Sequence, residues 1–283
     1  MKYKEFKQLV IENMPENDNP GLWQQKGVPQ KHILGNPSTP KEKAELINKH
    51  SLLPNVPSVD CETIHLHQYA HHLNSSQIMC YNFFRPMMED YNIQIKMYKP
   101  TDKLVDLIYR LIGSHEKITG SLCNFEYITK DRERTNFDFY YGNEDVEVFF
   151  EIKYTEQEFA KSSSAKNPHD QYDKVYKGMI KSAEEIFVGG TISENDFNTK
   201  YYQLARNAIR ATSSNKYVLF VYPEANENLR NQFKDFSEKC LTMEGKKRVK
   251  LLTWETIVQL AHELCIDVTD FMNRYLAFFN DDC

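Results

Sequence analysis

Residues 135–155 have the sequence TNFDFYYGNEDVEVFFEIKYT, in which two alternating runs of apolar and polar residues flank a polar turn. Successive side chains of a β-strand point to opposite faces of a sheet, so each run predicts a strand. The Gly-Asn pair at 142–143 is typical of a hairpin turn between them. The hairpin places Glu151 and Lys153 on one face of the second strand, with Asp138 beside them on the first.

The carboxylates and the lysine of this hairpin suit one kind of chemistry. Two carboxylates from adjacent strands offer the hard oxygen ligands that Mg²⁺ prefers, alongside waters and substrate phosphate oxygens. We therefore predict a metal site formed by Asp138, Glu151 and the main-chain carbonyl of Ile152, with Mn²⁺ as a substitute ion. Lys153 can orient or deprotonate a metal-bound water and so aim a hydroxide at phosphorus.

A different interpretation treats these charges as the solvent-exposed face of an edge hairpin. Phe149 shares that face and other aromatic residues flank it, so we expect partial burial. Carboxylates without a partner are costly to bury unless a cation is present. The metal site is therefore the favoured interpretation.

Asp138 and the sequence Glu-Ile-Lys at 151–153 resemble the active-site signature of the PD-(D/E)XK phosphodiesterase superfamily, the restriction-endonuclease-like nucleases. Phe137 stands where the name of the superfamily has a proline. Three segments are also similar to its restriction-endonuclease branch: LNSSQIMCYNFF at 73–84, EIKYTE at 151–156 and YYQLARN at 201–207. The resemblance spans about residues 60–260.

The resemblance implies a fold, an activity and a partner. The expected fold is α/β, a restriction-endonuclease-like core with a mixed central sheet flanked by helices in the order αβββαβ. The expected activity is that of a Mg²⁺-dependent endonuclease, a hydrolase of phosphodiester bonds. The expected partner is nucleic acid, DNA in the first place. Gln203 is implied as a glutamine beside the active site, although an ordinary helix-surface residue is equally open.

Further residues are candidates for the same site. Glu126, on the preceding strand, can add a metal ligand or form an ordinary salt bridge. Arg206 lies three residues after Gln203 and so shares a helix face with it. Three residues that match the restriction-endonuclease branch stand at a helix start, where a phosphate can bind. They are Ser75, Ser76 and Gln77.

The net charge of −5 counts modestly against a nuclease, because proteins that bind nucleic acid are commonly basic. Metal-site carboxylates account for part of this charge, and local potential is what steers DNA. The segment 160–181 is the best candidate for a local basic patch. Lys161 and Lys166 within it are predicted to contact substrate.

The composition, 41% apolar and 13% aromatic, indicates a globular protein. No apolar run approaches the ~18 residues that a membrane helix needs, and the first residues lack the apolar core of a signal peptide. The six cysteines are scattered without a C-x-x-C pair, which favours reduced thiols over a zinc site or disulfides. We expect a cytoplasmic protein with no membrane partner. The oligomeric state is open, with a homodimer as one candidate.

Residues 1–58 differ from the rest of the chain, because seven of the eleven prolines lie there. Such a segment cannot form a core of its own. We predict an N-terminal arm that either wraps the main domain or reaches toward a partner, and favour wrapping because Trp23 and Leu34 need burial. Residues 59–283 then form the nuclease domain, with a helical insertion at about 157–198.

The periodicity along the chain predicts the order of elements. Helices are expected at 3–13, 40–49, 59–88 with a break near 74–76, 101–112, 173–187, 200–211, 230–240, 256–264 and 268–279. Strands are expected at 121–129, 137–141, 146–152, 217–222 and 249–254. From residue 101 to 222 this pattern leads to the order αβββαβ independently of the resemblance.

Four histidines at 65, 67, 71 and 72 suggest a metal site, because His67 and His71 would share one face of a helix. However, no glutamate stands between them in the HExxH order, and the superfamily does not use such a cluster. We therefore favour a structural role.

Two other classes of function remain as alternatives. The chain can be a nucleic-acid-binding or scaffolding module that keeps the fold without turnover, since fold does not fix function. It can also be an RNA-directed nuclease, although no stacking motif of the single-strand RNA readers is present. The presence of all three of Asp138, Glu151 and Lys153 disfavours the non-catalytic module.

Overall fold

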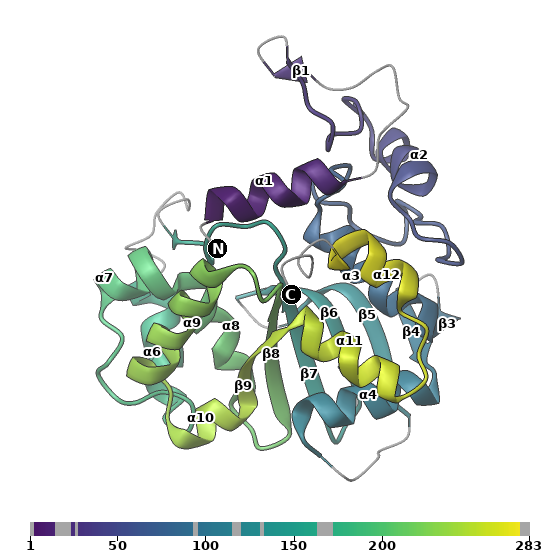
Figure 1. The fold of residues 1–283 in the computed structure, drawn as a ribbon. Helices are drawn as coiled ribbons and strands as arrows, with labels where there is room; N and C mark the ends of the chain where they lie inside the picture. The colour runs from purple at the N-terminus through teal and green to yellow at the C-terminus, as the bar shows by residue number, and fades with distance from the viewer. Residues whose placement is uncertain are drawn as a thin grey trace.

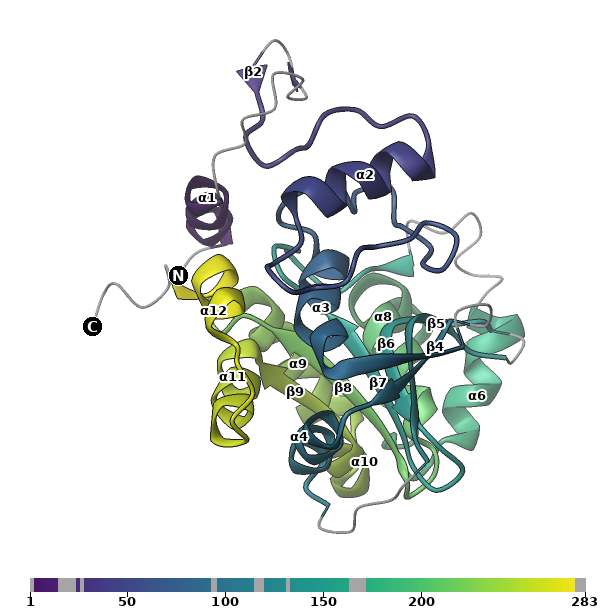
Figure 2. The same cartoon turned by 90° about the vertical axis from the view of Figure 1, so that its right-hand side faces the viewer.

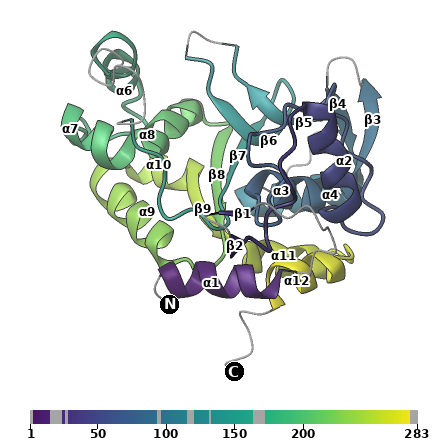
Figure 3. The same cartoon turned by 90° about the horizontal axis from the view of Figure 1, so that it is seen from above.

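A seven-stranded mixed sheet forms the centre of the protein, with helices on both of its faces (Figures 1 and 3). The mixed sheet flanked by helices is the arrangement that the sequence predicted. The computed structural model describes residues 3–14, 24–25, 28–92, 96–114, 120–130, 133–162 and 172–277.

The strands lie side by side in the order β3-β4-β5-β6-β7-β8-β9. Neighbours from β3 to β7 run antiparallel, whereas β7, β8 and β9 run parallel. Their bounds are β3 Met88–Asn92, β4 Met97–Pro100, β5 Leu122–Ile128, β6 Asn136–Gly142, β7 Glu147–Ile152, β8 Lys216–Tyr222 and β9 Val249–Thr253. The strands β5 to β9 lie where alternation and apolar runs predicted them.

Strands β3 and β4 were not predicted from the sequence. They form one edge of the sheet, and four of the five residues of β3 are exposed. An edge strand of this kind has no buried face to impose an alternating pattern. A separate pair of short strands, β1 at Gln24–Gln25 and β2 at Val28–Pro29, lies in the N-terminal region.

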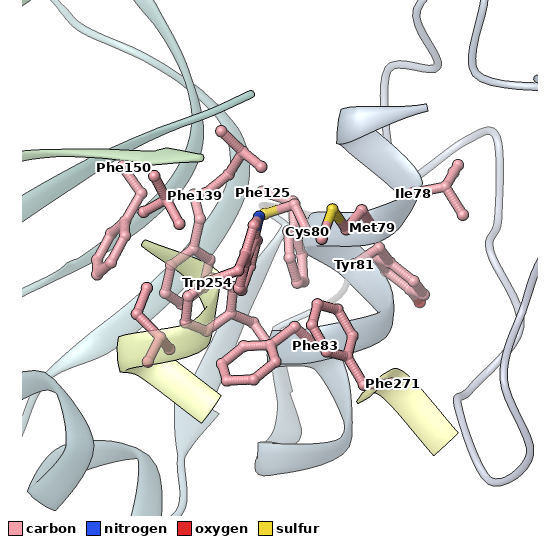
Figure 4. Packing of buried hydrophobic residues seen from close by; sticks show 14 of the residues in the cluster. Ile78, Met79, Cys80, Tyr81, Phe83, Phe125, Phe139, Phe150, Trp254 and Phe271 are labelled. Atoms are coloured by element: carbon pink, nitrogen blue, oxygen red, sulfur yellow. The ribbon is translucent and has the colours of Figure 1, made fainter. Parts of the chain in front are cut away.

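Four helices and a short 3₁₀ turn lie on one face of the sheet: α3 Ser76–Phe84, η1 Arg85–Met87, α4 Asp102–Ile112, α11 Trp254–Glu263 and α12 Thr269–Tyr275. Their apolar side chains join those of the sheet in one buried cluster (Figure 4). Phe84 of α3 stacks on Phe139 of β6 with ring centroids 4.1 Å apart. Phe83 packs edge-on against Trp254 and Phe271. These contacts fix α3 against the sheet.

The other face carries the helices of the segment between β7 and β9 (Figure 3). They are the π-helical turn η4 Tyr172–Tyr176, α6 Lys177–Ser182, α7 Glu194–Asp196, the π-helical turn η5 Phe197–Tyr201, α8 Tyr202–Ala208, the 3₁₀ turn η6 Ile209–Ala211, α9 Glu227–Cys240 and α10 Met243–Arg248. A second buried cluster joins these helices to the sheet. The short helix α10 was not predicted.

Several helix ends follow the sequence signals directly. Thr101 caps α4 by accepting from the N–H of Leu104, and Gly113 ends it in the left-handed region at φ 78°. Ser75 caps α3 by accepting from the N–H of Ile78. The long helix predicted over 59–88 is wrong for 59–75, which forms turns held by local hydrogen bonds.

The N-terminal region holds α1 (Tyr3–Asn13) and α2 (Pro40–His50), and α2 lies next to α3 (Figure 2). Phe6, Leu34 and Ile47 from this region belong to the same buried cluster as the sheet. Helices α1 and α2 and the segment around Leu34 therefore pack onto the main body. The division at residue 58 stays a prediction, and Trp23 lies outside the described residues.

The strands β5 and β6 change faces halfway along their length. Phe139 packs in the cluster with α3, whereas Phe137, two residues earlier, packs in the opposite cluster. Phe125 and Tyr127 of β5 divide in the same way. Strict alternation would put each pair on one face, so that expectation was wrong here. Between them on β5, Glu126 has a φ of 52°, in the left-handed region that non-glycine residues rarely adopt.

Within the described residues, no helix is long and apolar enough to cross a membrane.

Candidate active site

The side chain of Asp138 fills a gap in the sheet between β6 and β7. The register of these two strands ends at the pair Phe139 and Phe150. Beyond it, Asp138 Oδ2 accepts a hydrogen bond of 2.6 Å from the main-chain N–H of Ile152. The Asp138 carboxylate thus takes the place of a main-chain carbonyl and is held at the end of β7, beside Glu151.

Glu151 is 5% exposed and is held by three donors. Lys153 Nζ and Gln203 Nε2 each lie 2.8 Å from its Oε1 atom, and Asn207 Nδ2 lies 2.9 Å from its Oε2 atom. Lys153 itself lies just beyond β7, yet its ammonium reaches back to Glu151. The structure therefore brings Asp138, Glu151, Lys153 and Gln203 together, and the exposed-face interpretation is wrong for Glu151 and Lys153, which are both buried.

Ten of the residues that line a hollow of about 540 Å³, which we call the carboxylate hollow, are of three kinds. The kinds are carboxylates, the lysine and arginine, and polar residues at the start of α3 and on α8. These ten residues are Ser75, Ser76, Gln77, Glu126, Asp138, Glu151, Lys153, Glu156, Gln203 and Arg206. The N-terminal turn of α3 thus faces the same space as the acidic side chains.

The carboxylates oppose one another's ionisation. Burial raises the pKa of Asp138 well above its usual range, and the charges of Glu151 and Glu126 add to this shift. Burial also raises the pKa of Glu126 to about 7. For Lys153, burial lowers the pKa, but the charges of Glu151, Glu156 and Asp138 outweigh it and raise the pKa above the ordinary value. The lysine is therefore an ammonium near neutral pH.

These shifts predict how the stability of the metal-free protein depends on pH. Because the folded state holds the protons of Glu126 and Asp138 more tightly than the unfolded state, their contribution to stability is fully present below the ordinary pKa values of these carboxyl groups. It is lost as the pH rises through the raised pKa values of the folded state, which for Glu126 is about 7. Glu126→Gln should reduce the loss of folding stability that accompanies the rise in pH. Thermal melts in EDTA between about pH 5 and 8 measure it, with the exposed Glu89→Gln as the control. If the melting temperature changed equally with pH in wild type, Glu126→Gln and Glu89→Gln, the prediction would be contradicted.

Two of the other predicted residues, Glu126 and Gln77, lie at the carboxylate hollow and are hydrogen-bonded to their neighbours. Glu126 accepts from Asn136 Nδ2 at 2.6 Å, and its carboxylate also pairs with the Gln77 amide. Gln77 further holds the loop before α3, because its amide bonds the N–H of His67 and the carbonyl of His65.

Ser76 Oγ donates to Glu156 Oε1 at 2.8 Å, which ties α3 to the loop after β7. The guanidinium of Arg206 lies over the ring of Tyr202, 5.2 Å from its centroid, and Arg206 lines the carboxylate hollow. Lys161 is not brought to this hollow, since it pairs with Glu158 at 2.7 Å and lines a different one. Lys166 lies outside the described residues.

The residues present fit a hard divalent cation. Asp138 and Glu151 supply carboxylate oxygens, and the Ile152 carbonyl follows directly on the chain. In the described part of the chain, no three His, Cys, Asp or Glu side chains converge as a complete metal cage. Mg²⁺ does not need one, because it commonly binds one or two carboxylates and keeps waters and substrate oxygens as its other ligands. The excess of buried carboxylates over Lys153 is a further reason to expect a cation here.

Asn207 is a site residue that the sequence analysis missed. It is fully buried, and its Nδ2 group is the donor to Glu151 Oε2. A signal was available, because Asn207 lies four residues after Gln203 and so shares its helix face.

Asn207→Leu should destabilise the protein by ~1–3 kcal/mol, because the buried Glu151 Oε2 loses its donor while the side-chain volume is nearly kept. Urea unfolding in EDTA measures this, and Asn228→Leu, an exposed position on α9, is the matched control. If both variants unfold at the wild-type urea concentration, Asn207 does not hold Glu151.

The mixed sheet flanked by helices fits the restriction-endonuclease-like class of proteins. The chain belongs to the family described as restriction endonuclease associating with ARP (REase-ARP), whose model matches residues 29–281. This match confirms the restriction-endonuclease resemblance. Searches of curated proteins and of solved structures found no match.

Proposed function

We propose that the protein is a Mg²⁺-dependent endonuclease that hydrolyses phosphodiester bonds of nucleic acid, DNA in the first place. The observation that carries the proposal is the convergence of Asp138, Glu151 and Lys153 in one hollow with the start of α3. The family model supports it, since its description is that of a restriction endonuclease. Within the sheet, we assign the αβββαβ core to the run from α4 through β5, β6, β7 and α8 to β8.

In the proposed site, some residues hold the metal ion and others hold the carboxylates in position. Asp138, Glu151 and the Ile152 carbonyl would hold Mg²⁺, which when bound activates a water and offsets the negative charge of the phosphate. Gln203 and Asn207 hold the Glu151 carboxylate in place through their amides. Asp138 is held through the N–H of Ile152. Both carboxylates are therefore fixed before any substrate arrives.

Lys153 has a narrower role than the sequence suggested. Its raised pKa means that the metal-free protein carries an ammonium there, which donates hydrogen bonds but cannot accept a proton. We propose that Lys153 orients the attacking water and stabilises negative charge at the phosphate. We also propose that N–H groups at the start of α3 and the hydroxyl of Ser75 bind phosphate oxygens, whereas the hydroxyl of Ser76 already donates to Glu156.

The test is incubation of the purified protein with plasmid, linear duplex and single-stranded substrates, in Mg²⁺, Mn²⁺, Ca²⁺ or EDTA. Cleavage is expected in Mg²⁺ and Mn²⁺, while Ca²⁺ should permit binding with little turnover because its looser geometry suits the displacement poorly. Undiminished cleavage in EDTA would refute the metal-dependent mechanism. Binding in every buffer with no cleavage would favour the non-catalytic module of the same fold.

The same assay with single-stranded RNA and structured RNA decides between DNA and RNA as the substrate. A cytoplasmic location and a homodimer stay predictions, and sedimentation of the protein with and without a duplex tests the dimer.

A further inference from the structure

The aromatic residues of the carboxylate hollow have no role in the proposed chemistry. Besides the acidic side chains, His67, Tyr69 and His72 line it. Tyr69 is 53% exposed, and it is one of five large apolar side chains that are exposed in the described residues. The other four, Tyr91, Ile128, Val188 and Met243, do not line this hollow. A solvent-facing ring therefore stands at the candidate active site.

The ring of Tyr69 is framed by two imidazoles. Its centroid lies 5.6 Å from that of His67 and 5.2 Å from that of His72, with tilted planes. His72 is supported in turn by His71 and His32, whose rings meet it edge-on at 4.6 and 5.9 Å. The aromatic surface is thus continuous and is backed by other rings.

The main chain that carries Tyr69 is tied down. Tyr69 N–H donates to His67 Nδ1, and the Tyr69 carbonyl accepts from the N–H of His72. The segment then pairs with the N-terminal region through the bridge between Ile33 and His72. The segment that carries Tyr69 is therefore held in place before a ligand binds, so little ordering entropy opposes binding.

The charge at this surface suits a base better than a phosphate. Burial lowers the pKa of His72 and of His32 to about 4, so both imidazoles are neutral near pH 7. Burial also lowers the pKa of His67 and of His71. Neutral rings offer stacking area and hydrogen bonds but no positive charge for an anion.

Tyr69 and His72 also line a second hollow of about 350 Å³, which we call the histidine hollow. These two residues are thus shared by both hollows, and the second is further lined by Lys43, Gln68 and His71. Lys43 Nζ donates to the carbonyl of His67 at 3.0 Å, which ties this lysine to the segment that carries Tyr69. A chain that leaves the carboxylate hollow across Tyr69 thus enters a space with polar and basic groups.

We propose that Tyr69, framed by His67 and His72, is a stacking platform for an unpaired nucleobase next to the scissile phosphate. This inference rests on the proposed nuclease function. Bases inside a duplex are covered on both faces by their neighbours, so only a single-stranded, frayed or extruded nucleotide can offer a face to Tyr69. The preferred substrate class is therefore nucleic acid with an unpaired nucleotide, which a single strand offers at every position, with the phosphate at the carboxylate hollow and the adjacent base on Tyr69.

The test is a double-mutant cycle, in which removal of the Tyr69 ring is combined with removal of the bases from the nucleic acid. Fluorescence anisotropy in Ca²⁺ measures binding of a short single-stranded oligonucleotide, the same strand with abasic sites, and a blunt duplex. Tyr69→Ala should weaken binding of the intact strand by about 5- to 150-fold and of the abasic strand by less than about 2-fold, because only the intact strand has bases to stack. Tyr69→Phe keeps the ring and should bind like wild type.

Tyr91→Ala is the matched control, since Tyr91 is a more exposed tyrosine on the edge strand β3. Equal loss on intact and abasic strands, no loss on either, or no binding by the wild type would overturn the platform.

Cleavage in Mg²⁺ is scored separately. If the wild-type protein binds in a base-dependent way but does not cleave, the proposed nuclease function is overturned and the stacking role of Tyr69 stands. If wild type and Tyr69→Ala cleave a single strand equally fast at limiting substrate, the stacking role of Tyr69 is overturned and the proposed nuclease function stands.

Discussion

Lys153→Met is expected to lower the rate of phosphodiester cleavage by about 10²–10⁴-fold, the range that a positioned proton-transfer or charge-stabilising group commonly contributes. Lys153 is 9% exposed, and its ammonium sits 2.8 Å from Glu151. Methionine keeps most of the volume and removes the charge, while Gln203 and Asn207 still hold Glu151. Single-turnover cleavage at saturating Mg²⁺ measures the effect.

Lys153→Arg separates charge from geometry. It keeps the positive charge beside the carboxylates, so the fold should be retained, but a planar guanidinium cannot place a compact ammonium at the same point. Its rate should remain far below wild type. Lys216→Met is the control, because Lys216 pairs with Glu147 at the other end of β7. If Lys153→Met and Lys153→Arg both cleave like wild type, Lys153 has no part in the reaction.

Asp138→Asn is expected to abolish cleavage without harming the metal-free fold. The amide oxygen of asparagine can still accept from the N–H of Ile152, which Asp138 does at 2.6 Å. One of several mutually repelling carboxyl groups is lost, so the metal-free protein should be as stable as wild type or more stable by up to ~1–2 kcal/mol. Mg²⁺ should raise the melting temperature of wild type more than that of the variant, since binding to the native state stabilises it.

Asp138→Ala is compared with Asp138→Asn to separate loss of the hydrogen-bond acceptor from loss of the charge. Alanine removes the acceptor as well as the charge, and leaves the Ile152 N–H without its partner at a cost of ~1–3 kcal/mol. We therefore expect asparagine to be tolerated and alanine to be destabilising in EDTA. If asparagine instead caused a marked loss of stability in EDTA, Asp138 would be a structural residue in an ion pair and not a metal ligand.

The sequence predicted the hairpin and the later strands because their periodicity reflects burial. The helix ends at Thr101, Gly113 and Ser75 were predictable because capping is a local interaction. The meeting of Asp138 with Glu151 could be expected for a similar reason, since a hairpin fixes its own register.

Other features depend on contacts that leave no local pattern. The strands β3 and β4 are formed by pairing at a sheet edge. The turns of residues 59–75 are closed by local hydrogen bonds, but the segment is tied to other parts of the chain by bonds such as that from His67 N–H to Gln77. Tyr69 lines the same hollow as Glu151 only because that loop is folded against the carboxylate hollow. The role of Asn207 required knowing which face of α8 meets β7.

The change of faces along β5 and β6 has a consequence for how the molecule unfolds. Each strand contributes aromatic side chains to both buried clusters, Phe125 and Phe139 to one and Tyr127 and Phe137 to the other. Neither helical layer can separate from the sheet without disturbing strands that also anchor the opposite layer. We expect a single cooperative transition, in which the fluorescence of Trp254 on one side and the circular dichroism of the whole chain change together.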